Sequence, residues 1–372
     1  MRTYVLTTVG VSLLGQIRNK FEISDGKLPD ERQVVAFLRK HKPEDRECGA
    51  EINSLAALLS GTQLSTGTPE APAAVQLLVS DTDEGEWVGQ VLCQYLPKWQ
   101  GPKIEDVQMA RVSQLNGEDY KSFANQGLKS LVTQAIECLK SAETKWPEAK
   151  RVINATGGYK AQISFAGLIG QVMDVPVVYL FEHFAQCIEL QPLPVAFDRG
   201  LWLENYWLFN ALAEKGEMVE WRRVCNYQVD KRIADLLIRV EIDGKEYVEL
   251  SPILELLHQG FKSTPPEEME QPPDSGINPA DKLKIAPDHH RPNGAKTRFQ
   301  QLAELPWVKR VETIELANTP ISRPKSGGNT AVNEILVIHS DGSKGVEIRL
   351  ITTCSTDAER NWCLEELKTV MV

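Results

Sequence analysis

The sequence predicts an α/β protein in which a doubly wound, mainly parallel sheet is followed by smaller modules. Up to about residue 195, apolar strand-like runs alternate with amphipathic helical segments, which is typical of a parallel sheet covered on both faces. Three polar or glycine-rich segments follow predicted strands: Thr7 to Ser12, Ser80 to Thr82, and Asn154 to Lys160. Because ligands of such sheets bind at the carboxyl ends of the strands, these segments are candidates for one binding site.

Composition and charge limit the classes of function. The 372 residues are 42% hydrophobic and 25% charged, which is ordinary for a globular chain of two or three domains. The net charge of −10 means that a polyanion would have to meet a local basic patch. Seven cysteines without Cys-x-x-Cys spacing favour reduced thiols over a disulfide framework or a zinc site. The chain starts directly in a strand pattern, without a leader or a membrane-spanning run, so we expect a soluble, cytoplasmic protein.

The predicted elements of residues 1–195 alternate in type. The strands are Thr3 to Val9, Val75 to Val79, Ile104 to Val112, Arg151 to Ile153 and Val175 to Phe181. The helices are Arg32 to Lys40, Glu51 to Leu59, Glu84 to Tyr95, Asp119 to Lys145 and Lys160 to Met173, with a further helix opening near Ser12. The segment Ser80 to Thr82 is expected to cap the helix that follows it.

The stretch Asn154 to Lys160, with the sequence Asn-Ala-Thr-Gly-Gly-Tyr-Lys, joins a strand to a helix. Paired glycines permit a tight turn with bare N–H groups, and the helix N-terminus behind them attracts phosphate, as does the charge of Lys160. Many strand-to-helix turns carry glycine for backbone reasons alone, so a purely structural role is the alternative. The pattern lacks G-x-G-x-x-G and a ribose-binding acid, which disfavours a nicotinamide dehydrogenase.

Two motifs carry a resemblance to a known family. Thr7-Thr8-Val9-Gly10-Val11-Ser12-Leu13-Leu14 and the Asn154 to Lys160 stretch resemble the signature motifs of CRISPR-associated Rossmann-fold (CARF) sensor domains, over roughly residues 1 to 195. The resemblance implies a homodimer that binds a cyclic oligoadenylate, the second messenger of type III CRISPR systems, across its two-fold axis. A ring of four adenylates is the favoured activator, although the sequence does not determine the ring size.

The resemblance also implies which residues touch the ligand. They are Thr8, Gly10, Ser12, Thr156, Gly157, Gly158 and Lys160. Ser80 and Asp81 are further candidates because they follow a strand at the same sheet edge, and Tyr159 is a candidate within the glycine turn. Asn154 is expected to brace the turn instead. Tyr159 either stacks on an adenine or packs under the helix. Some relatives also cleave their ligand slowly, and Ser12 and Lys160 are the residues that would align and stabilise such a reaction.

Residues 196–262 resemble a winged-helix-like module. We expect helices at Leu201 to Glu214 and Lys231 to Leu237, a hairpin about Asp243-Gly244, and a helix after Ser251 that ends near Phe261. Acidic and basic residues are mixed around the second helix, which favours a dimerising or coupling role. DNA binding, and with it a ligand-gated transcription regulator, is the alternative.

Residues 263–293 are rich in proline and acids, which predicts an extended linker. Residues 294–372 are expected to form a small α+β effector domain. Its predicted elements are a helix from Ala295 to Leu305, a strand from Trp307 to Leu316, a hairpin about Asp341-Gly342 and a helix from Thr356 to Val370. The segment from Lys284 to Lys325 contains eight basic and four acidic residues, which gives it a net charge of +4 in an acidic chain. This layout and its basic residues resemble RelE-type mRNA interferases.

That resemblance implies a metal-independent endoribonuclease that cleaves mRNA on the ribosome. Neither the arginine–histidine helix motif of HEPN ribonucleases nor a metal-nuclease motif is found, since Glu347-Ile-Arg349 matches E-x-K poorly. The expected catalytic residues are Arg291, Arg323, Lys325 and Arg349 for charge stabilisation, with His289 or His290 for proton transfer. A solvated loop is the alternative for the histidine pair, and no metal or cofactor is expected.

Together, the two resemblances imply a cyclic oligoadenylate-activated, ribosome-dependent mRNA endoribonuclease of type III CRISPR antiviral defence. Its expected partners are a second copy of the chain, cyclic oligoadenylate, and mRNA on the ribosome. Two alternatives stay open: a ligand-gated transcription regulator, and a ring nuclease that degrades cyclic oligoadenylate.

Overall fold

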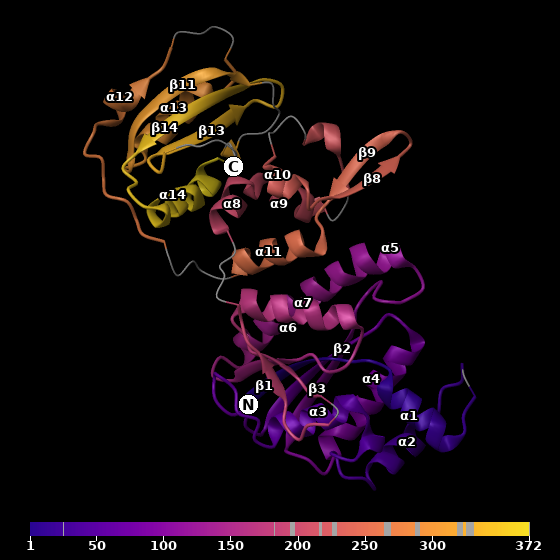
Figure 1. Ribbon diagram of the computed structural model, residues 1–372. Coiled ribbons are helices and arrows are strands. Elements are labelled where there is room, and N and C mark those ends of the chain that lie inside the picture. Colours follow the sequence, from indigo (N-terminus) through magenta and orange to yellow (C-terminus); the bar gives the residue numbers. More distant parts are fainter. Residues whose placement is uncertain are drawn as a thin grey trace. The chain divides into compact units, whose positions relative to one another are not determined.

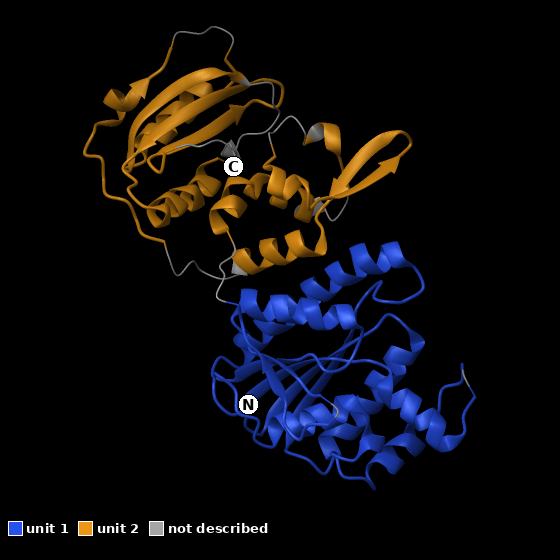
Figure 2. Ribbon diagram, in the orientation of Figure 1, with its two compact units in different colours: residues 1–195 blue, residues 196–372 orange. Residues whose placement is uncertain are grey.

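The computed structural model describes residues 1–24, 26–181, 183–193, 198–215, 218–224, 229–263, 269–286, 291–317, 323–324 and 331–371 (Figure 1). The chain divides into two compact units, residues 1–195 and 196–372 (Figure 2). None of the described helices is both long and apolar enough to cross a membrane.

The first unit is built on a sheet whose described strands have the order β3-β2-β1-β4-β5-β6. The strands are β1 Thr3–Thr8, β2 Ala73–Val79, β3 Ile104–Arg111, β4 Lys150–Asn154, β5 Val177–Tyr179 and β6 Ile188–Leu190. Strands β1 to β5 run parallel, which confirms the predicted parallel sheet, and β6 pairs antiparallel to β5. The strand order reverses between β1 and β4, and this is the position where open α/β sheets bind ligands.

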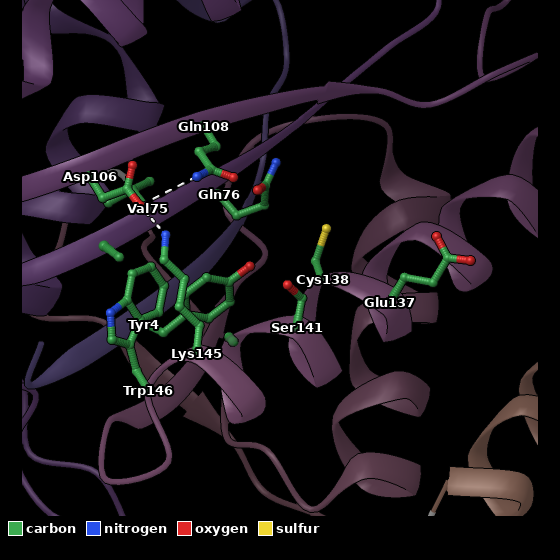
Figure 3. Close-up of a pocket in the computed structure, with 12 residues that line it drawn as sticks. Tyr4, Val75, Gln76, Asp106, Gln108, Glu137, Cys138, Ser141, Lys145 and Trp146 are labelled. Carbon is green, nitrogen blue, oxygen red and sulfur yellow. Dashed lines mark hydrogen bonds and ion pairs between the residues drawn. The ribbon is translucent and has the colours of Figure 1, made fainter.

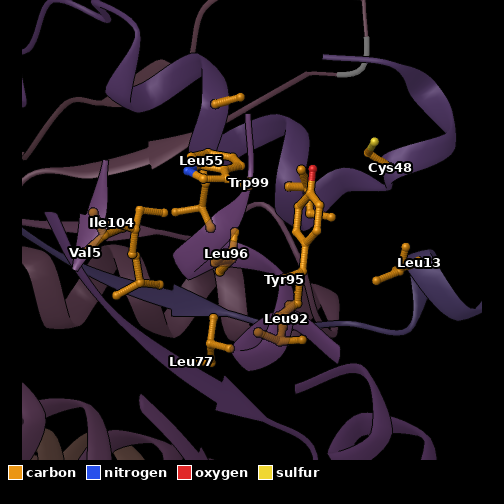
Figure 4. Packing of buried hydrophobic residues seen from close by; sticks show 14 of the residues in the cluster. Val5, Leu13, Cys48, Leu55, Leu77, Leu92, Tyr95, Leu96, Trp99 and Ile104 are labelled. Atoms are coloured by element: carbon orange, nitrogen blue, oxygen red, sulfur yellow. The ribbon is translucent and has the colours of Figure 1, made fainter. Parts of the chain in front are cut away.

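Helices cover both faces of this sheet (Figure 1). They are α1 Ser12–Phe21, α2 Glu31–Leu38, α3 Ala50–Leu59, α4 Asp83–Tyr95, α5 Tyr120–Ser122, α6 Leu128–Lys145 and α7 Lys160–Met173. Helices α1 to α4 pack on the face that carries Val5 and Leu77, forming the apolar core of Figure 4. Helices α6 and α7 lie on the other face, against Leu6 and Ile153. Burying both faces explains why the strands read as continuous apolar runs.

Several local predictions in this unit are confirmed. Thr82 caps α4 by accepting a hydrogen bond from Gly85 N over 3.0 Å. Helix α7 spans the residues expected for it. The long helix expected from Asp119 is instead α5 and α6 joined by a π-helical turn at Phe123–Gly127.

The first part of the second unit contains four helices and a small antiparallel sheet among its described residues. The elements are α8 Arg199–Glu204, α9 Tyr206–Lys215, β7 Val219–Glu220, α10 Lys231–Ala234, β8 Ile238–Ile242, β9 Lys245–Glu249 and α11 Pro252–Ser263. The predicted hairpin is confirmed, because Asp243 and Gly244 have φ of 50° and 71°, as a two-residue turn of this type requires. The single helix expected from Leu201 breaks at Asn205, whose buried side chain donates to Leu201 O over 2.8 Å.

The rest of the second unit is a sheet with helices. The elements are α12 Pro279–Lys282, β10 Leu283–Lys284, α13 Ala295–Glu304, β11 Val308–Ala317, β12 Arg323–Pro324, β13 Glu334–Ser340, β14 Gly345–Thr352 and α14 Asp357–Val370. The described strands have the order β10-β11-β14-β13-β12, which adds two short edge strands to the three that the sequence predicts.

The expectation that residues 263–293 form an extended linker needs correction for their described part. Within it, β10 pairs parallel to β11, and the side chain of Lys282 is buried, donating to Leu305 O over 2.8 Å. Ser275 N also donates to Pro306 O over 2.9 Å. The carbonyl groups of Leu305 and Pro306, just after α13, therefore bind the segment from Ser275 to Lys282, although this segment is too polar to form a core by itself.

Candidate functional site

The two segments that resemble sensor motifs lie side by side at the carboxyl ends of β1 and β4. Thr8 Oγ1 donates a hydrogen bond to Gly157 O over 2.6 Å. A Cβ atom at Gly10 would lie 2.6 Å from Gly158 N, and one at Gly157 would lie 2.8 Å from Thr8 O. The backbones approach so closely that only glycine fits at these positions.

The turn before α7 is shaped by local contacts. Gly158 has φ of +98°, a conformation that glycine adopts without strain. Gln162 accepts a hydrogen bond from Tyr159 N over 2.5 Å and so fixes the first turn of α7. Lys160, the first residue of the helix, is exposed to solvent. The turn therefore presents an exposed N-terminal edge with a mobile cation.

Asn154 and Thr156 connect this turn to the sheet and to α3. The buried Asn154 amide donates to Ser54 Oγ over 2.8 Å, as its expected bracing role requires. Thr156 Oγ1 donates to Asn154 Oδ1 over 2.7 Å and accepts from Leu180 N over 3.0 Å. The turn is thus tied to β4 and α3 through side chains and to the backbone just after β5.

A buried carboxylate occupies the N-terminal end of α1, and sequence reasoning missed it. Glu51 is 0% exposed, and its oxygens accept from Gly10 N over 3.0 Å and from Ser12 Oγ over 2.8 Å. These are two of the donors that the sequence assigns to a phosphate. Since Ala50 N donates to Ser12 Oγ over 3.4 Å, the first turns of α1 and α3 cap one another.

A cavity of about 630 Å³ opens beside these segments. It is lined by the first residues of α1 and α3, among them Ser12 and Gly49, and by Thr156 from the glycine turn. Arg46 and His183 supply further polar groups to its wall, and Phe184 an aromatic ring. Its size is that of a typical small-ligand site. Of the predicted contact residues, only Ser12 and Thr156 line it.

Two predicted ligand contacts have hydrogen-bond partners within the protein. Ser80 Oγ lies 2.9 Å from Thr82 Oγ1. Asp81 accepts from Gln114 N over 2.8 Å and from Arg111 Nε over 2.6 Å, and these hydrogen bonds hold the pKa of its carboxyl below the ordinary value. Both residues follow β2, and neither lines the cavity.

Tyr159 packs against another aromatic side chain. Its ring centroid is 5.1 Å from that of Phe123, with the rings 80° apart. Phe123 belongs to the π-helical turn before α6. Of the two roles left open for Tyr159, this contact favours packing.

A second hollow, of about 250 Å³, lies near the amino ends of the strands, between the sheet and α6 (Figure 3). Three of its polar side chains are paired with each other: Lys145 Nζ is 3.0 Å and Gln108 Nε2 3.3 Å from Asp106 Oδ2. Burial raises the pKa of Cys138 in its wall to about 11, so this thiol stays protonated. The hollow is therefore a weaker candidate than the cavity at the glycine segments.

Only part of the predicted effector site falls on described residues. His289, His290 and Lys325 lie outside them, and Arg323 is described only as backbone in β12. The guanidinium of Arg291 lies 5.5 Å from the ring centroid of Phe299.

Arg349 is paired with acids on the neighbouring strands. Its Nε is 2.5 Å from Glu334 Oε1, and its Nη1 is 3.7 Å from Glu312 Oε2. These carboxylates on β13 and β11 compensate its charge, so Arg349 in this arrangement stabilises the sheet. Among the described residues, no three His, Cys, Asp or Glu side chains are grouped as metal ligands.

Comparison with known proteins gives one family match. Residues 46–193 match the family described as CRISPR-associated protein (Cas_APE2256). This part includes α3 with Glu51 and the glycine turn but not β1, and it is less than half of the chain. No curated protein matches the chain.

Among solved structures, the chain is similar to Enterococcus italicus Csm6 bound to cyclic hexa-2'-fluoro-hexa-dAMP. The identity is 10% and the TM-score 0.24, with 63% of this chain and 54% of that chain covered. The chain thus spans about half the length of that protein, and a TM-score this low supports no argument about fold or function.

Proposed function

We propose that residues 1–195 form a CARF-type sensor of cyclic oligoadenylate and that the second unit carries a ribonuclease which the ligand activates. The observation that carries this proposal is the direct contact between the glycine segments of β1 and β4, beside a cavity of about 630 Å³ at the point where the strand order reverses. The match of residues 46–193 to a CRISPR-associated family supports a role in CRISPR defence, which we propose to be of type III and in the cytoplasm.

In this proposal, the ligand's phosphates bind where helix N-termini and a cation converge. The first turns of α1 and α3 border the cavity, and Lys160 stands at the start of α7. Arg46, which the sequence does not single out, adds a cation to the cavity wall. A ring with internal symmetry suits two identical chains, so we propose a homodimer with the ligand at its two-fold axis.

For the second unit we propose a RelE-type mechanism without metal. The 2′-hydroxyl of the mRNA attacks the adjacent phosphate and forms a 2′,3′-cyclic phosphate, while the bond from phosphorus to the 5′-oxygen of the next nucleotide breaks. Arg291, Arg323 and Lys325 stabilise the developing charge, and His289 or His290 transfers the proton of the 2′-hydroxyl to the leaving 5′-oxygen. Arg349 joins them only if its ion pairs with Glu312 and Glu334 open. Residues 196–262 would couple the sensor to residues 294–372, with 263–293 between them.

The test incubates the full chain with mRNA on translating ribosomes or with naked RNA and measures RNA cleavage. Each substrate is tested without ligand, with cyclic tetra-adenylate and with cyclic hexa-adenylate. We expect cleavage only on ribosomes and only with one of the rings. Ligand-dependent cleavage of naked RNA would indicate another nuclease class. Ligand-dependent DNA binding without cleavage would indicate the transcription regulator, and loss of the ring alone would indicate a ring nuclease.

A matched variant separates the sensor from the effector. Lys160→Ala should raise the ligand concentration needed for half-maximal cleavage at least tenfold without changing the maximal rate. Lys129→Ala, on α6, is the control and should change neither. Equal ligand dependence in Lys160→Ala and the unaltered chain would remove Lys160 from the proposed site.

A further inference from the structure

Two buried cysteines are in contact in the second unit. Cys354 follows β14 and Cys363 lies in α14, and their Sγ atoms are 3.4 Å apart. Their residues are 5% and 0% exposed, within the apolar core. The other described cysteines, Cys48, Cys93, Cys138 and Cys187, all belong to the first unit.

The contact needs little movement to become a bond. A disulfide has an S–S distance of about 2.05 Å, so the sulfur atoms must approach by roughly 1.4 Å. The segment between them is held by the cap of α14: Thr356 accepts from Glu359 N, and Glu359 accepts from Ser355 N and Ser355 Oγ. This cap keeps Cys354 next to the second turn of α14 in the reduced chain.

The two thiols also differ chemically. The two sulfur atoms share a hydrogen bond in which either can be the donor. Donation from Cys363 lowers the pKa of Cys354 to about 7. The same hydrogen bond and burial raise the pKa of Cys363. Cys354 is therefore the nucleophile of the pair, and Cys363 is the thiol that can resolve its oxidised form.

We propose that Cys354 and Cys363 are a redox modification site, at which a small peroxide joins the end of β14 to α14 by a reversible disulfide. The Cys354 thiolate attacks hydrogen peroxide and forms the sulfenic acid, releasing hydroxide that takes up the thiol's proton as water. The sulfur of Cys363 then displaces water from the sulfenic acid and forms the S–S bond. Overall, two thiols and one peroxide give one disulfide and two waters, and a dithiol reductant restores the thiols.

Burial decides which oxidant acts. Because both residues are nearly inaccessible, hydrogen peroxide should react and glutathione disulfide, which is much larger, should react far more slowly. The cross-link closes a short loop around the N-terminal cap of α14, so its main effect is to hold this helix on the sheet.

The test uses the full chain, purified with reductant, exposed to hydrogen peroxide, alkylated and digested with trypsin. Arg360 lies between the two cysteines, so cleavage there separates peptide 350–360 from peptide 361–368. We expect these peptides to be linked after peroxide and separate after dithiothreitol. Oxidation should also raise Tm by roughly 5 °C in the unaltered chain.

Two variants complete the test. Cys363→Ala should abolish the linked peptide and the rise in Tm and leave Cys354 singly oxidised, whereas Cys93→Ala, on α4, should preserve both effects. The proposal is overturned if peroxide leaves both thiols of the folded chain available for alkylation. It is also overturned if the linked peptide forms only after denaturation, or if Cys354 pairs with a cysteine other than Cys363.

Discussion

At the scale of single residues, the least expected feature is a carboxylate where an anionic ligand was expected. Glu51 is fully buried between Gly10 N and Ser12 Oγ. The sequence holds one signal for it, because Glu51 precedes Ile52 on the apolar face of a short helix. Its two donors lie about 40 residues away in the chain, so no local pattern shows that they meet it.

We predict that Glu51→Gln binds cyclic tetra-adenylate about tenfold more tightly than the unaltered chain. Removing one charge at roughly 5 Å from a phosphate relieves repulsion of about 3 kcal/mol at an effective dielectric constant of 20, of which part is lost to rearrangement. Isothermal titration calorimetry measures the change, with Glu148→Gln, an exposed acid, as the control. Weaker binding by Glu51→Gln would instead show that Glu51 positions the loop for the ligand.

A second prediction concerns the glycines of the turn and of α7. Gly158→Ala should destabilise the first unit by about 1–3 kcal/mol, because its φ of +98° is strained for alanine and the new Cβ would meet Gln162 Oε1. Gly167→Ala, within α7 and with open space around it, should stabilise by up to about 1 kcal/mol. Urea unfolding gives both values, and equal effects of the two substitutions would contradict the assigned role of Gly158.

At the scale of elements, we predict that the cap of α14 is worth about 1 kcal/mol. Thr356 Oγ1 accepts from Glu359 N while Glu359 accepts from Thr356 N, so Thr356→Ala removes the acceptor of Glu359 N and keeps the second hydrogen bond. Thr369→Ala is the same change in the last turn of α14, where the exposed hydroxyl donates to Glu366 O, and should be nearly neutral. Chemical unfolding monitored by circular dichroism compares them. A similar loss in both variants would mean that the cap contributes nothing specific.

Long helices and strands could be predicted from the sequence, whereas very short ones could not. Strands of five or more residues, such as β1 and β2, and helices such as α7 carry enough apolar periodicity to be located. The edge strands β6, β10 and β12 span only two or three residues, and their pairing depends on neighbours elsewhere in the chain. The sequence places the glycine segments at one sheet edge because each directly follows a predicted strand. It does not predict the wall of the cavity, because residues such as Arg46 and His183 come from distant parts of the chain.

At the scale of the whole molecule, the two units differ in which parts of the chain build their hydrophobic cores. The core of the first unit is confined to residues 1–195. The core of the second unit joins α8 and α9, through Trp202 and Phe209, with α14 through Leu364. The helices from two ends of this unit are further tied by the 2.7 Å ion pair of Arg360 with Glu204. Composition predicts a separate small domain after residue 293, because the preceding segment is polar and rich in proline. Composition does not show which residues distant in the chain pack into one core.

We therefore predict that residues 196–372 fold as an isolated fragment and that residues 294–372 do not. The shorter fragment loses Trp202, Leu203 and Phe209 from its core, and Lys368, which lies 4.6 Å from the Trp202 ring and 4.4 Å from the Tyr206 ring, loses both aromatic contacts. Exposing this apolar surface to water is expected to cost more free energy than the small net stability of a domain of this size. Near-ultraviolet circular dichroism and urea titration should show fixed tertiary packing and cooperative unfolding for residues 196–372 and for the control fragment 1–195, and neither property for residues 294–372. Cooperative unfolding of residues 294–372 alone would show instead that the effector is an independent domain, and that activation must act through its tether and not through a core it shares with α8 and α9.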